Sequence, residues 1–161
     1  MSLPTPASVK FILREEPLAY CPRELKLDTP ERINDFLKTV VATDGSFEAG
    51  KENLILICLD ARLNFTGYSI LSVGTLTETA AHPRDIFRAA ILANACYFIL
   101  AHNHPSGEVS PSRADEQMTR KVDEAAAIMG IRFLDHVIFS TGYPTPGKLP
   151  YYSFREGGFI R

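Results

Sequence analysis

Hydrophobic residues recur along this chain with two different periods, and the changes of period mark alternating helices and strands. After Thr29-Pro30, apolar positions fall at the helical spacing i, i+3, i+4 and i+7, and the pattern ends before Asp44-Gly45. Those positions are Ile33, Phe36, Leu37 and Val40. The continuous apolar run at residues 53–59 is typical of a fully buried strand. It turns through residues 60–62 into a second strand at about 63–73, so the pattern predicts a core helix followed by a β-hairpin.

The second half of the chain repeats this alternation. A helix that begins near Pro83 is predicted to pack through Ile86, Ala90 and Ala93, and it leads into a strand that ends at His102. Ser110-Pro111-Ser112 indicates the start of another helix, and Gly130 would close it. The apolar stripe predicted for that helix is Ala114, Met118, Val122, Ala125 and Met129. With a last strand at 131–139, the order of elements predicts an α/β fold, a mixed β-sheet flanked by helices.

Two segments fit this pattern less well. Residues 1–28 carry several prolines and a short alternating piece at 9–14, which fits either an edge strand or a partner-binding arm. If that strand pairs with the same strand of a second chain, the protein forms a homo-oligomer, and this arrangement is open. We therefore divide the chain into an N-terminal arm, 1–28, and one domain, 29–161. The turn-rich residues 141–147 are interpreted as a connector rather than the border of a groove.

Composition narrows the class of protein. The chain has 161 residues, of which 45% are hydrophobic, enough for one packed core. No apolar stretch approaches the roughly 20 residues that cross a bilayer, and no signal segment opens the chain, so we expect a soluble cytoplasmic protein without a membrane partner. A net charge of −2 does not support nucleic acid as a partner. Cys21, Cys58 and Cys96 are an odd number without metal-binding spacing, and we expect reduced packing residues, the last two buried.

The segment His102-Asn103-His104-Pro105-Ser106-Gly107 carries candidate chemistry. Residues i and i+2 of an extended chain project to the same side, so the two imidazoles would point together. The following turn leads to a helix start that places Asp115 in the first helical turn. Nitrogen and oxygen donors of this kind suit Zn²⁺, which uses three protein ligands in catalytic sites. The spacing therefore predicts a zinc site formed by His102, His104 and Asp115.

A plainer interpretation stands beside this prediction. Ser112 and Asp115 have the spacing of a capping box, and the two histidines fit a solvated turn. His82 precedes a helix start and His136 lies in an apolar strand, so each is expected to cap a helix or to be a hydrogen-bonded core histidine rather than a metal ligand.

Taken together, the motif resembles the signature of the JAMM (JAB1/MPN+) metalloprotease family: His102-x-His104, seven residues, then Ser112-x-x-Asp115. The surrounding short sequence motifs are similar to those of the bacterial RadC branch over roughly residues 28–161. These motifs are Gly74-Thr75, His82-Pro83-Arg84-Asp85, Ala101 to Gly107, Pro111-Ser112-Arg113, Leu134-Asp135-His136 and Ser153-Phe154-Arg155-Glu156. The resemblance implies a JAMM/MPN architecture, which is cytidine-deaminase-like.

The resemblance also implies roles for individual residues. His102, His104 and Asp115 would bind zinc, and Ser112 would hold the site or the developing oxyanion. A glutamate near the start of the first central strand would act as general base toward water, and Glu52 is our choice. Glu48 is the fallback and Glu78 a weaker alternative. His136 or Asp135 is a candidate for orienting the ligand imidazoles.

The activity implied is zinc-dependent hydrolysis of a peptide or isopeptide bond in a protein or peptide substrate, which the RadC branch leaves unidentified. Compared with the full-length RadC pattern, we expect this chain to lack the N-terminal helix-hairpin-helix region of longer relatives. The alternative is a non-hydrolytic, metal-containing interaction module associated with DNA repair, replication or mobile elements. A nucleobase deaminase would need an H-x-E and a P-C-x-x-C word, and neither is present.

Overall fold

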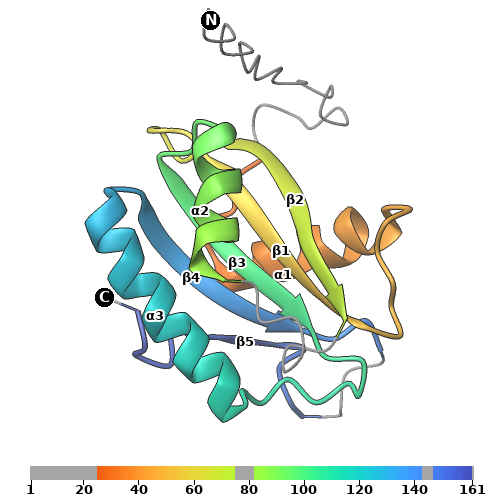
Figure 1. Ribbon diagram of the computed structural model, residues 1–161. Coiled ribbons are helices and arrows are strands. Elements are labelled where there is room, and N and C mark those ends of the chain that lie inside the picture. The colour runs from red at the N-terminus through yellow and green to blue at the C-terminus, as the bar shows by residue number, and fades with distance from the viewer. Residues whose placement is uncertain (1–24, 75–81, 143–146, 161) are drawn as a thin grey trace, which may run out of the picture.

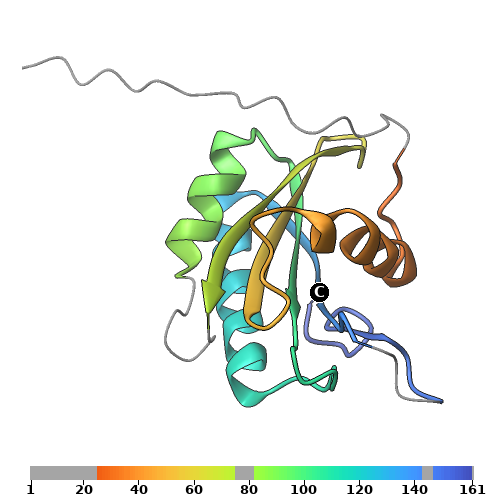
Figure 2. The ribbon, with the colours of Figure 1, turned by 90° about the vertical axis from the view of Figure 1, so that its right-hand side faces the viewer.

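A five-stranded mixed sheet forms the centre of the domain, with helices on both faces (Figures 1 and 2). The computed structural model describes residues 25–74, 82–142 and 147–160. The helices are α1 (Pro30–Thr39), a 3₁₀ turn η1 (Val41–Thr43), α2 (Pro83–Leu92) and α3 (Arg113–Met129). The strands are β1 (Glu52–Leu59), β2 (Phe65–Gly74), β3 (Tyr97–Asn103), β4 (Arg132–Phe139) and β5 (Tyr151–Ser153). The predicted α/β class with a mixed sheet flanked by helices is confirmed, and it matches a JAB/MPN fold.

The strand order is β2-β1-β3-β4-β5. β1 pairs antiparallel with both β2 and β3, which confirms the predicted hairpin, and β3 runs parallel to β4. β5 is antiparallel to β4 and was not predicted, because three residues are too few to show an alternating pattern. The parallel β3–β4 pair requires a crossover, and α3 provides it.

The sheet separates two hydrophobic cores, as the side view in Figure 2 shows with α1 on one face and α2 and α3 on the other. In β1, Leu54, Leu56 and Cys58 belong to the core under α2 and α3, while the alternate residues pack under α1. Residues 53–59 are all buried, because β1 is covered on both faces. This explains why its sequence is continuously apolar rather than alternating.

Helix starts follow the predicted capping chemistry. Thr29 accepts a hydrogen bond from the Arg32 backbone N–H, and Pro30 takes the first helical position of α1. The His82 ring accepts the Arg84 N–H at the start of α2, which confirms the capping role expected for this histidine. Gly130 ends α3 with φ of 68°, a left-handed conformation that suits glycine.

Several burial predictions are wrong. Ala114 and Met129 are exposed, and the buried residues of α3 are Asp115, Thr119, Val122 and Ala126. The face is rotated because two polar residues of a buried network occupy it, and a hydrophobic stripe cannot reveal them. Ala93 and Cys96 are also exposed, since α2 ends at Leu92 and both residues lie in the turn before β3.

Other predictions fall outside the described residues: those for Cys21, for Glu78, for the arm segment at 9–14 and for most of the 141–147 loop. Cys58 is buried with a free thiol, as expected, and burial raises its pKa to about 11. Among the described helices, none is long and apolar enough to cross a bilayer.

Candidate metal centre

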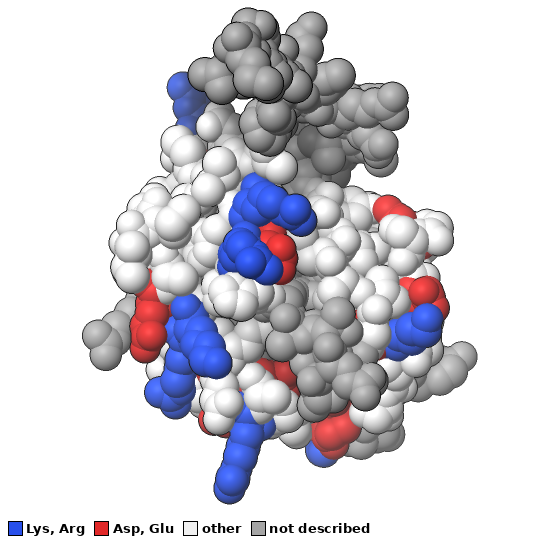
Figure 3. Space-filling view, viewed as in Figure 1, with Lys and Arg blue, Asp and Glu red and all other residues white. Residues whose placement is uncertain are grey.

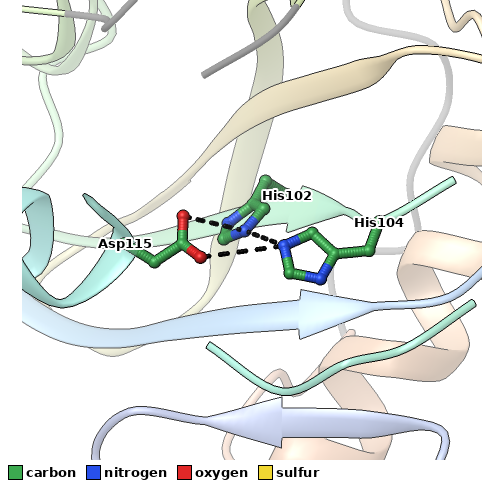
Figure 4. A group of neighbouring side chains, drawn as sticks. All are labelled: His102, His104 and Asp115. Atoms are coloured by element: carbon green, nitrogen blue, oxygen red, sulfur yellow. Dashed lines mark hydrogen bonds and ion pairs between the residues drawn. The ribbon is translucent and has the colours of Figure 1, made fainter. Parts of the chain in front are cut away.

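Three side chains from β3, the following turn and α3 converge at one point (Figure 4). They are His102, His104 and Asp115, and one ligand atom from each lies within 4.8 Å of the others. The Nε2 atoms of the two imidazoles are 3.0 Å apart. His102 Nε2 lies 3.4 Å from Asp115 Oδ1, and His104 Nε2 lies 3.7 Å from Asp115 Oδ2. The structure thus brings together all three predicted metal ligands.

Asp115 is placed by the start of α3. The Ser112 backbone N–H and hydroxyl both donate to Asp115 Oδ2, at 2.8 and 2.7 Å, and the Ser112 oxygen accepts the Asp115 N–H. This is the capping box of the plainer interpretation. The two interpretations are compatible, because the box bonds Oδ2 and leaves Oδ1 facing His102. Ser112 therefore fixes the orientation of Asp115.

His104 is held by the turn that follows β3. Gly107 donates its N–H to the His104 carbonyl and has φ of 83°, which favours glycine. This turn brings the Glu108 carbonyl oxygen to 2.6 Å from His104 Nδ1. A carbonyl only accepts hydrogen bonds, so His104 carries its proton on Nδ1 and presents a lone pair on Nε2.

His102 is held through a relay that begins at Thr119. The Thr119 hydroxyl lies 2.7 Å from both the Asp115 carbonyl oxygen and His136 Nδ1. Since it has one proton and the carbonyl needs it, the hydroxyl accepts from His136 Nδ1–H. His136 Nε2 then accepts from His102 Nδ1 at 2.8 Å. By this assignment, His102 also presents a lone pair on Nε2.

At the centre, hydrogen-bond acceptor atoms of His102, His104 and Asp115 therefore face one another with no proton between them. Two imidazole lone pairs point at each other, and Asp115 Oδ1 is buried without a hydrogen-bond partner. If each group of the relay donated in the opposite direction, His102 would carry its proton on Nε2, between the two imidazoles. The Thr119 hydroxyl would then donate to His136, and its contact with the Asp115 carbonyl would have no proton. A cation at the centre satisfies all of these contacts together. The donor set of two neutral imidazoles and one carboxylate therefore fits a divalent metal such as zinc.

The pKa values agree with a site built for a cation. Burial lowers the pKa of His102 to about 4, which keeps this ring neutral. Burial lowers the pKa of His104 as well, but the nearby Asp115 carboxylate and the Glu108 carbonyl outweigh it and raise the pKa overall. Burial raises the pKa of Asp115, yet contacts with His104, His102 and Ser112 hold it well below its usual range. Asp115 therefore keeps its negative charge near neutral pH.

Glu52 lies at the start of β1, beside the centre. β1 and β3 pair with Leu54 opposite His102, and the same register continued by two residues aligns Glu52 with His104. Leu54 faces the core under α2 and α3, so alternation places Glu52 on the face that carries the imidazoles. The Glu52 charge also contributes to the raised pKa of His104, as the smallest of its causes.

An asparagine pair fixes this strand end. Asn103 Oδ1 accepts from the backbone and side-chain N–H groups of Asn53, at 2.8 and 2.9 Å, and Asn103 Nδ2 donates to the Lys51 carbonyl. Both asparagines are fully buried. The residues on either side of Glu52 are thus tied to the residue between the two metal-site histidines.

Glu48 and Glu78 are the alternatives to Glu52 as general base. Glu48 pairs with Lys51 at 2.7 Å, and both side chains are half exposed. Glu78 lies outside the described residues. The predicted catalytic roles of Glu52 and Ser112 stay predictions, because position alone does not establish them.

The sequence did not reveal three supporting elements: Thr119, the Glu108 carbonyl and the Asn53–Asn103 pair. For Thr119 a signal was present, since it follows Asp115 by one helical turn and shares its face. The candidate role of His136 in orienting an imidazole agrees with its contact to His102. Asp135 touches no ligand and accepts the His136 backbone N–H instead.

The fold and the convergent His-His-Asp set define a metal-site domain of the JAB class. The chain belongs to the RadC family, since it matches the RadC-like JAB domain over residues 27–159. A UPF0758 protein of Thermotoga maritima is 40% identical over 129 residues, 80% of this chain and 55% of that protein. One from Thermosynechococcus vestitus is 46% identical over 103 residues, 64% of this chain and 41% of the relative. The chain spans about half the length of the curated relatives it matches.

Proposed function

We propose that this chain is a zinc-dependent hydrolase of the JAMM type that cleaves a peptide or isopeptide bond in a protein or peptide substrate. The observation that carries the proposal is the set of two unprotonated imidazole nitrogens and one carboxylate, beside Glu52 on the neighbouring strand. Three protein donors are typical of catalytic zinc sites, whereas structural sites use four. The cluster contains three donors from the described residues.

The residues divide the chemistry between them. A bound zinc ion supplies Lewis acidity, which lowers the pKa of water to roughly 7 and polarises a carbonyl. His102, His104 and Asp115 hold the ion, and the Thr119–His136 relay keeps the His102 ring in the required tautomer. Glu52 takes the proton of the attacking water and returns it to the leaving amine. The Asn53–Asn103 pair holds the start of β1, where Glu52 lies, against the end of β3.

The competing proposal is a metal-containing interaction module that does not turn over a substrate. It predicts the same metal content and no catalysis, so metal analysis alone does not distinguish the two. We propose the substrate class and the activity for the whole protein on the same grounds. We also propose that the protein acts in the cytoplasm, where the free thiols of Cys58 and Cys96 would stay reduced.

The first experiment is elemental analysis of protein purified without chelator or metal-affinity resin. We expect about one zinc per chain, by the stoichiometry of the site, and none in the His102→Ala variant. A wild-type protein that takes up no metal even when zinc is added back would remove the hydrolase proposal.

The second experiment measures cleavage of quenched-fluorescence peptide pools and of isopeptide-linked peptides by the zinc-loaded chain. Glu52→Gln should keep zinc and lose about 10²-fold or more in rate, the usual contribution of a general base. Glu48→Gln is the matched control and should keep both. An active Glu52→Gln variant would assign the general base to another residue, and a zinc-loaded wild type that cleaves neither bond type would favour the interaction module.

A further inference from the structure

A second cavity lies far from the metal centre within the same fold. Its volume is about 830 Å³, and it opens on the α1 face at the starts of β3 and β4. The metal centre lies at the end of β3 on the opposite face. The two sites therefore share no lining residue, and ligands at one do not compete directly with ligands at the other.

Four cationic side chains line this cavity, each from a different segment. Lys26 precedes α1, Arg62 lies in the turn between β1 and β2, Arg132 begins β4, and Arg155 follows β5. Their side chains form no ion pair or hydrogen bond with any residue that the structure describes. The Arg62 charge acts on Asp60, which already accepts hydrogen bonds from Asn64. The Arg155 charge acts in the same way on Asp135, a carboxylate of the lining.

The carboxylates of the cavity are largely occupied. Asp28 pairs at 2.8 Å with Arg32, a residue that does not line the cavity, and Glu31 accepts a hydrogen bond from the Tyr151 hydroxyl. Asp135 accepts three hydrogen bonds from neighbouring backbone and hydroxyl groups. Glu156 is the fourth acidic lining residue. Hydrogen bonds do not remove the charge of a carboxylate, but Arg32 compensates Asp28, so the four lining cations face three uncompensated carboxylates. The cavity therefore carries a small excess of positive charge.

The rest of the lining is apolar. Leu27, Ile33, Leu59 and Ile99 are buried side chains at its base, and the Tyr97 ring is half buried beside them. The first turn of α1 also borders the cavity, and its backbone N–H groups add positive potential there. A ligand that fits would carry an anionic group for the cations and a flat or apolar body for the base.

We propose that this cavity binds a small organic phosphate of about nucleotide size. Arginine forks match phosphate oxygens in paired hydrogen bonds, and a diphosphate engages several cations together. The volume lies in the range of small-molecule sites, about 300–1,000 Å³. The chain as a whole carries a net charge of −2, which disfavours long polyanions and favours a local site. This inference is independent of the proposed hydrolase function.

The test is calorimetric titration of the metal-free full chain with ADP at constant ionic strength. We expect one saturable site per chain, weaker binding of inorganic pyrophosphate and none of adenosine. The double variant Arg132→Gln/Arg155→Gln should bind ADP at least tenfold more weakly. The matched control is Arg84→Gln/Arg88→Gln, two exposed arginines on α2 that pair with Asp85 outside this cavity, and it should bind as the wild type does. Figure 3 shows such charged side chains on the face that α2 covers.

Four results would overturn the proposal. These are the absence of saturable ADP binding, an equal loss in the control pair, loss of binding in His104→Ala, and adenosine binding as tightly as ADP. Affinity for oligothymidylate that rises with length and exceeds that for ADP would also overturn it, because it would indicate a surface for nucleic acid. Urea unfolding of each variant establishes that a loss of binding is not a loss of fold.

Discussion

Asp115 and Asp135 are both almost completely buried, at 1% and 3% exposure, but their surroundings differ in one decisive respect. Asp135 accepts from the His136 N–H and the Arg155 N–H through Oδ1, and from the Ser153 hydroxyl through Oδ2. Asp115 receives protein donors on Oδ2 alone, and its Oδ1 faces the lone pair of His102 Nε2 at 3.4 Å. A saturated carboxylate joins pieces of the fold, whereas an unsaturated one beside unprotonated imidazoles is suited to bind a cation.

The pKa directions express the same difference. At Asp135, burial outweighs the hydrogen bonds and raises the pKa. At Asp115, burial is outweighed by His104, His102 and Ser112, and the pKa falls. The site carboxylate therefore remains charged wherever the protein is folded near neutral pH, which is what a metal ligand needs.

The largest expected effect separates these two carboxylates by metal content. Asp115→Asn should lose stoichiometric zinc, because the amide carries no charge, while the unfolding free energy of the metal-free protein changes by less than about 1 kcal/mol. Elemental analysis and urea unfolding measure the two quantities, and His104→Ala should lose zinc in the same way. Zinc content that stays unchanged in both variants would disprove the site.

Asp135→Ala should show the opposite profile. Two backbone N–H groups and one hydroxyl lose their acceptor, so we expect a loss of about 2–4 kcal/mol in unfolding free energy. The folded fraction should still bind one zinc. If Asp135→Ala loses zinc without losing stability, the distinction between the two aspartates is wrong.

Thr119→Val tests the relay that connects the ligand imidazole to α3. The valine keeps the shape but leaves His136 Nδ1–H without an acceptor, so zinc affinity should fall about 10-fold, the lower end of the range for such supporting groups. A competitive chelator titration measures it. Thr119→Ser keeps the hydroxyl and should bind zinc nearly as the wild type does; equal losses in the two variants would remove the hydroxyl from the relay.

The smallest effect concerns the exposed rim of the metal centre. Hydrogen bonds from Lys148 and Ser110 lower the pKa of Glu108 to about 2. A lowered carboxyl pKa adds stability above the unfolded value of about 4.3 that is lost as pH falls through about 2. The wild type should thus be slightly more stable than Lys148→Met at pH 6, and urea unfolding should show the difference shrinking between pH 4 and 2. A difference independent of pH would argue that the pair does not contribute through charge.

Much of the fold could be predicted from the sequence because its signals are local. The continuous apolar run of β1, the turn after it, and the caps at Thr29 and Gly130 act within a few residues, and each was found where expected. β5 was missed because its three residues are held by pairing with β4 rather than by a pattern of their own. The α3 face was misplaced because buried Asp115 and Thr119 look like surface residues in the sequence.

For the metal centre, the sequence determined the ligands: the His-x-His alternation and the capped helix that carries Asp115 are local features. Only the tertiary structure decided that these ligands present lone pairs rather than protons. That decision depends on Thr119, His136 and the Glu108 carbonyl, which come from three different parts of the fold. Proton positions follow from hydrogen bonds between groups distant in the chain, and such contacts leave no periodic trace in an amino-acid sequence.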